Sequence, residues 1–135
     1  MPGIDECLLE AMTLPGARGA AIVDWTSGLA LGSVGASPNG DPEETATETA
    51  EVARSAAEYR AFTPGDGALD QQPGREGLQV EDLMLITRNG FHVIRFVETT
   101  FDSSVFLYLW LDRHSGNLAL ARMRLRDLSQ RLVLV

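Results

Sequence analysis

Seven consecutive apolar or aromatic residues, Val-Phe-Leu-Tyr-Leu-Trp-Leu at positions 105–111, stop abruptly at Asp112 and Arg113. A strand with one face in water alternates polar and apolar residues, whereas a short unbroken apolar run is typical of a strand covered on both faces. We therefore predict that residues 105–111 form the central strand of a sheet. The rest of the chain must supply its neighbouring strands and the helices that cover it.

Length and charge narrow the function classes. The chain has 135 residues, which fits a single domain with a core of its own. Its formal net charge is −8, which disfavours a surface built for nucleic acid or anionic lipid. All 11 basic residues are arginine, so a P-loop lysine, a Schiff-base lysine and a lysine nucleophile are excluded. No apolar run approaches the roughly 18 residues of a membrane span, so we predict no membrane insertion.

The single cysteine, Cys7, cannot form an internal disulfide. With only His92 and His114 beside it, a Cys/His zinc cage of the usual kind cannot be assembled, and we predict neither a metal nor a cofactor. The N-terminus has no basic region followed by an apolar one, as a secretory signal would. A reducing cytoplasm is the simplest setting, with Cys7 as a core residue on an amphipathic helix.

Periodicity and turn signals predict five strands and three helices. The strands are expected at 18–25, 29–34, 82–88, 91–97 and 105–111, and the helices at 4–13, from Asp41 to about Phe62, and from about Ser115 onward. Asp41-Pro42 is a helix start and Asn89-Gly90 a hairpin signal. Residues 63–81 are expected to form a mobile connection, and the apolar tail 132–135 is left unassigned.

Such elements can form one antiparallel-rich sheet with strands 105–111 and 18–25 in the middle and strand 82–88 at an edge. The edge strand is apolar on both faces, through Leu83, Met84, Leu85 and Ile86. Proteins normally avoid such an edge because its unpaired backbone recruits other chains. Pairing with a second copy would resolve this problem.

The helix from Asp41 carries a stripe of small residues that allows close approach to a sheet or to another helix. The stripe is Ala46, Ala50, Ala53 and Ala57, flanked by Val52, Ala56 and Tyr59. We predict a homodimer whose interface is made by these four alanines and by the four apolar residues of the edge strand.

Candidate catalytic residues are few. Three residues near strand ends could act as a general base and the groups that orient it: Asp24, Asp112 and His114. Such residues more often cap turns, so we predict no enzymatic role for them. His92 alternates with apolar neighbours on a strand, which directs it to solvent or to a hydrogen bond. The last helix carries three arginines, Arg122, Arg124 and Arg126. They either form a solvated face or supply an arginine finger to a GTPase.

Three segments carry a further pattern: Leu14-Pro-Gly-Ala-Arg-Gly-Ala-Ala-Ile-Val-Asp-Trp-Thr-Ser-Gly-Leu29, Phe106-Leu-Tyr-Leu-Trp-Leu-Asp-Arg113 and Asn117-Leu-Ala-Leu-Ala-Arg122. Together they resemble the Roadblock, or dynein light chain, domain, as found in small Roadblock-like proteins of actinobacteria. The resemblance spans most of residues 4–128. It departs from the family in the long connection 63–81 and in the apolar tail after Arg131.

The resemblance implies a single α/β, profilin-like domain over residues 1–135, with a core at about 4–130 and a five-stranded sheet in the order 2-1-5-4-3. It also implies a homodimer made by pairing third strands and packing second helices, and a role in regulating or scaffolding Ras-like small GTPases. Two function classes follow: a non-catalytic interaction module of this kind, or a small-molecule sensor or hydrolase on a similar α/β sandwich.

Overall fold

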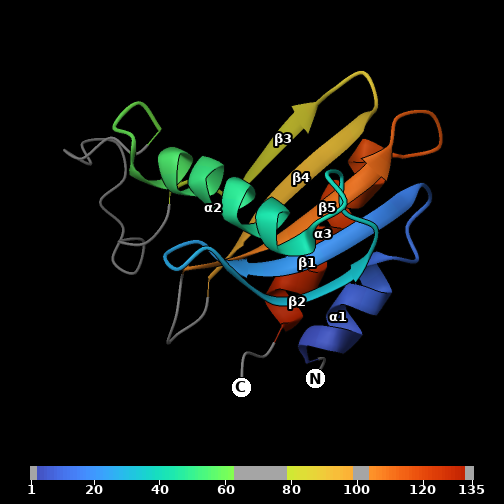
Figure 1. The fold of residues 1–135 in the computed structure, drawn as a ribbon, viewed down its shortest axis with the longest axis horizontal. Coiled ribbons are helices and arrows are strands. Elements are labelled where there is room, and N and C mark those ends of the chain that lie inside the picture. The colour runs from blue at the N-terminus through green and yellow to red at the C-terminus, as the bar shows by residue number, and fades with distance from the viewer. Residues whose placement is uncertain (1–2, 63–78, 99–103, 133–135) are drawn as a thin grey trace.

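The computed structural model describes residues 3–62, 79–98 and 104–132 (Figure 1). In chain order its elements are α1 (Ile4–Ala11), β1 (Ala17–Asp24), β2 (Leu29–Gly35), α2 (Pro42–Glu58), β3 (Asp82–Ile86), β4 (Gly90–Val97), β5 (Val105–Asp112) and α3 (Leu118–Arg131). The strands form one antiparallel sheet in the order β2-β1-β5-β4-β3. The predicted fold class and strand order are confirmed. Most of the connection 63–81 and of the tail lies outside the described residues.

Strand β5 is the centre of the sheet, and both of its faces are buried. Leu107, Leu109 and Leu111 join the core beneath α1 and α3, while Phe106 and Tyr108 join the core beneath α2. Figure 1 shows the same division, with α1 and α3 on one face of the sheet and α2 on the other. The unbroken apolar run is therefore explained by two helical layers that each take alternate side chains.

Helix α2 begins where the sequence predicts and ends earlier. The Asp41 carboxylate accepts hydrogen bonds from the backbone N–H groups of the first turn, including that of Glu43 at 3.0 Å. The predicted end near Phe62 is wrong, because Tyr59 already has extended backbone angles of φ −71° and ψ 133°. Residues 58–62 are exposed, so further helical turns would find no core to cover.

Helix α3 begins three residues later than predicted. Its N-cap is Asn117, whose side-chain oxygen accepts a hydrogen bond from Leu120 N at 3.0 Å. Ser115, the predicted start, instead donates hydrogen bonds from its backbone and its hydroxyl to the Asp112 carboxylate, both at 2.9 Å. The residues between β5 and α3 thus form a turn held by Asp112.

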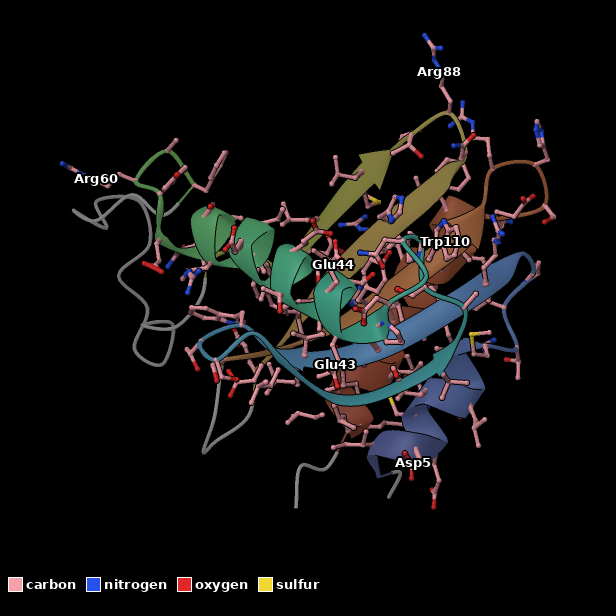
Figure 2. All side chains as sticks on the ribbon, in the orientation of Figure 1. Asp5, Glu43, Glu44, Arg60, Arg88 and Trp110 are labelled. Atoms are coloured by element: carbon pink, nitrogen blue, oxygen red, sulfur yellow. The ribbon has the colours of Figure 1, made fainter. Side chains whose placement is uncertain are left out.

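The β3–β4 hairpin is present, but the predicted Asn89-Gly90 turn is wrong. Thr87 N donates to Gly90 O at 2.9 Å, so Arg88 and Asn89 are the two turn residues; Figure 2 shows Arg88 at the tip of the hairpin. Gly90 already belongs to β4, where a Cβ atom would lie 2.5 Å from the carbonyl oxygen of Leu111. Glycine is required here for close strand approach and not for the turn.

Cys7 is a fully buried core residue, as predicted, and packs in the cluster beneath α1 and α3. Burial raises the pKa of its thiol from 9.0 to about 11, and the nearby Glu10 carboxylate adds to the effect. The thiol is therefore protonated and shielded at neutral pH.

This pKa predicts an alkaline loss of stability. Above pH 9.0 the thiol ionises in the unfolded chain but stays protonated in the folded one until about pH 11, so the free energy of unfolding should fall across this window. Urea titrations at a series of pH values should show a shallower fall for Cys7→Ala than for the wild type. Identical pH slopes for the two proteins would contradict the buried thiol.

Candidate partner interface

Strand β3 is an edge strand with large apolar side chains in the open. Met84, Leu85 and Ile86 are 42%, 52% and 58% exposed, while Leu83 packs against the core beneath α2. Its five residues pair with β4 in an unbroken register, from Asp82 opposite Arg95 to Ile86 opposite Phe91. The strand therefore presents a regular, apolar edge that can accept another strand.

The opposite edge of the sheet, strand β2, is built differently. Its pairing with β1 shifts between Ile22 and Val23, which leaves Leu31 as an extra residue between Ala30 and Gly32. At its end, Gly35 has a positive φ of 82°. Bulges and irregular glycines protect an edge against strand addition. Among the described strands, β3 is therefore the edge suited to pairing.

The predicted interface alanines do not lie on the open surface. Ala46, Ala50 and Ala53 are at most 2% exposed and pack on the sheet of their own chain, and Ala57 packs against the same core. Small side chains here allow α2 to lie close to the sheet. Any partner surface on α2 must be made by other residues.

The flank of α2 that points away from β2 carries exposed apolar residues. Thr47 donates a hydrogen bond to the backbone oxygen of Gly28 at 3.4 Å, which identifies the side of α2 that faces the start of β2. Helical spacing places Val52 on the other side of α2, and Tyr59 is the C-cap that follows the last turn. They are 43% and 61% exposed.

We call five exposed residues the β3 patch: Val52 of α2, its C-cap Tyr59 and Leu85 of β3 on the α2 face of the sheet, and Met84 and Ile86 of β3 on the other face. Sequence reasoning identified the three strand residues and placed Val52 and Tyr59 beside the alanine stripe only as flanking residues. The exposure of these two side chains depends on how α2 lies on the sheet, which the sequence pattern alone does not give.

His92 lies beside the β3 patch, opposite Leu85 in the β3–β4 register. Its Nδ1 atom is 2.8 Å from the Tyr108 hydroxyl, and its ring stacks on Trp110 with centroids 6.4 Å apart. Burial lowers the pKa of His92. Of the two predicted environments for this side chain, the structure has the hydrogen bond.

The three candidate catalytic residues do not come together. Asp24 ends β1 opposite Val105, at the start of β5, whereas Asp112 and His114 lie at the other end of β5. Asp24 accepts hydrogen bonds from Thr26 N and Oγ1 at 2.9 and 2.7 Å. Burial tends to raise the pKa of Asp24, but these hydrogen bonds outweigh it and hold the pKa below its usual value.

Asp112 has a similar structural role. Hydrogen bonds from the backbone and hydroxyl of Ser115, together with the backbone N–H of His114, hold the pKa of Asp112 below its usual value. Both carboxylates are thus occupied in holding turns, at opposite ends of the sheet.

The arginines of α3 mainly tie elements together. Arg122 forms an ion pair with Asp82 of β3 at 3.0 Å, and Arg131 pairs with Glu10 of α1 at 2.6 Å. Arg124 approaches the Thr13 hydroxyl at 3.5 Å. Arg126 is exposed, as a solvated face requires.

Helix α2 is acidic on its outer face, where Glu44, Glu48, Glu51 and Glu58 are exposed.

No helix in the described part of the chain is long and apolar enough to cross a membrane.

Comparison with known proteins gives a match in structure and not in sequence. Neither the models of known protein families nor the curated protein sequences match this chain. MglB of Myxococcus xanthus superposes with a TM-score of 0.72 at 17% identity, over 94% of this chain and 82% of that one. The Roadblock/LC7 domain of Streptomyces avermitilis gives 0.65 at 16% identity, over 96% and 94%.

A third solved structure, the gliding protein MglB of Thermus thermophilus, gives a TM-score of 0.69 at 18% identity over 94% of this chain and 83% of that one. A further MglB structure is described as having a tetrameric arrangement. The chain therefore has the Roadblock-type fold.

Proposed function

We propose that this protein is a non-catalytic homodimer of the cytoplasm that regulates or scaffolds a Ras-like small GTPase. The observation that carries the proposal is the β3 patch: a regular apolar edge strand beside an apolar helix flank, on a Roadblock-type fold. The buried, unpaired thiol of Cys7 suits a reducing compartment.

The dimer follows from the shape of this patch. Antiparallel pairing of two β3 strands would extend the sheet across both subunits and satisfy the open backbone groups of the edge. Val52 and Tyr59 of the two α2 helices would then meet above the joined strands. An interface of standard size, about 800 Å² per partner, covers such a surface, and a two-fold axis makes each patch meet its own copy.

The GTPase partner rests on the resemblance to Roadblock domains. The structural likeness to a Roadblock/LC7 domain and to MglB supports it, and the tetrameric arrangement of one MglB structure supports assembly beyond a single chain. The carboxylates of Asp24 and Asp112, two of the three candidate catalytic residues, hold turns at opposite ends of the sheet. This supports a binding role for the protein over a hydrolytic one.

The test uses the Ras-like GTPases of the protein's own genome. Purified wild-type protein at micromolar concentration should change the rate of nucleotide hydrolysis or exchange of at least one of them, which would indicate regulation. Co-elution with a GTPase without a change in rate would indicate scaffolding.

The variant Ile86→Glu serves as the matched control, because its change is confined to the β3 patch. A GTPase that needs the dimer should not respond to this variant. If no GTPase of this genome shows a rate change or co-elutes with the protein, the proposed partner is overturned. The dimer is judged separately, by mass.

A further inference from the structure

A groove of about 550 Å³ runs between strand β2 and the N-terminal half of α2, away from the β3 patch. Its walls include Leu29, Ala30 and Ser33 of β2, and Glu43 and Thr47 of α2. Glu43 lies over β2 in Figure 2, on the side of α2 that faces this edge. Because β2 and β3 are opposite edges of the sheet, pairing through β3 would leave the groove open.

Two leucines of β2 are exposed at this edge. Leu29 and Leu31 are 65% and 46% exposed, although they belong to a regular element of the fold. Exposed large apolar side chains beside a groove mark an interaction site more strongly than scattered ones do. The core does not need either leucine, so their apolar surface is available to another molecule.

The charge around the groove has one sign. Asp41 and Glu43 line it, and none of its lining residues is basic. On the other face of β2, a carboxylate oxygen of Asp5 would lie 3.9 Å from a Cβ atom added at Gly32. The groove is therefore acidic, and a further carboxylate lies on the other face of β2, which favours a positively charged occupant.

The edge itself excludes one kind of occupant. The extra residue Leu31 and the positive φ of Gly35 interrupt the outer backbone row of β2, so an added strand could not form a continuous ladder. An occupant must instead contribute side chains. A helix with an apolar stripe and basic flanks meets both requirements.

We propose that the groove between β2 and α2 is a docking site for a basic amphipathic helix of a partner protein. The apolar stripe of that helix covers Leu29 and Leu31, and its lysines or arginines lie against Asp41 and Glu43. The site does not depend on the proposed GTPase function or on the dimer.

The probes are two fluorescent peptides of about 18 residues, or five helical turns. Both carry the same leucine stripe, and their polar faces carry lysines in one and glutamates in the other. In fluorescence anisotropy at physiological salt, the lysine peptide should bind the wild-type protein at micromolar concentration and the glutamate peptide should not. The double variant Leu29→Ser and Leu31→Ser should weaken binding of the lysine peptide by about tenfold or more.

The control carries a comparable change of an exposed apolar residue to serine away from the groove, namely Met123→Ser on α3, and should leave the affinity within about twofold. Ile86→Glu should also leave it unchanged, which separates this site from the β3 patch. Thermal melts confirm that each variant is folded. Equal binding by the wild type and the leucine variant, equal loss in the control, or no binding of the lysine peptide would each overturn the proposal.

Discussion

Replacing Ile86 with glutamate is expected to halve the mass of the particle in solution. The wild type should have twice the 14.6 kDa of one chain at micromolar concentration, and Ile86→Glu should have the mass of one chain. Ile86 is 58% exposed in the single chain, so the fold itself tolerates the change. Like charges brought together at an interface cost several kcal/mol, which weakens the dimer by about a hundredfold or more. Light scattering or sedimentation measures the mass.

The control for this experiment is Met123→Glu, which introduces the same charge on α3 at a residue that is 68% exposed and lies outside the β3 patch. Its mass should match that of the wild type. A wild-type mass near 14.6 kDa would show that the β3 edge is not a self-association site, whatever the variants do.

Ala53→Arg is expected to unfold the protein and not merely to separate subunits. Ala53 is 0% exposed and packs on the sheet beneath α2, so an arginine there would be a buried charge without a partner. Leaving a charge buried and unpaired costs about 3–5 kcal/mol, a large part of the roughly 5–15 kcal/mol that stabilises a domain. Circular dichroism during urea titration should show an early transition or none.

Ser55→Arg provides the comparison on the same helix. Its hydroxyl donates only to the backbone oxygen of Glu51, at 3.0 Å on the exposed side, so the free energy of unfolding should change by no more than about 0.5 kcal/mol. A well-folded Ala53→Arg monomer would mean that the alanine stripe faces a partner, as the sequence suggested, and not the sheet.

The sequence was informative wherever a pattern had one physical solution. The unbroken run at 105–111 fits only a strand covered on both faces, and this fixed the centre of the sheet. Asp41 followed by proline is a helix start in almost any context, and it was located correctly. The apolar edge strand from Leu83 to Ile86 was also predicted, because its residues alternate neither in polarity nor in size.

Where a pattern had two solutions, the sequence could not choose between them. An alanine stripe suits a helix on a sheet as well as a helix on another helix, and the structure places Ala46, Ala50 and Ala53 on the sheet. Asn89-Gly90 suits a turn, but Gly90 is required by the approach of the backbone of β5. Both choices depend on neighbours that are distant in sequence.

The groove beside β2 could not be predicted for a related reason. Leu29 and Leu31 fit a strand pattern, and Asp41 fits a helix cap, so each residue had a local explanation. Only the relative placement of β2 and α2 brings Leu29 and Asp41 into the lining of one groove, with Leu31 between two further lining residues, Ala30 and Gly32.

The position of β5 has a consequence for how the chain reaches its folded state. The strand made last during synthesis, β5, is the one in the middle of the sheet. Ile22 of β1 therefore gains its second neighbouring strand only when Leu107 of β5 has been synthesised. Two-stranded hairpins are marginal in water, so neither β1–β2 nor β3–β4 is stable alone. Such distant pairing slows folding and leaves nascent chains open to aggregation until β5 arrives. We therefore expect the β1–β2 and β3–β4 hairpins to become stable only when β5 pairs between them.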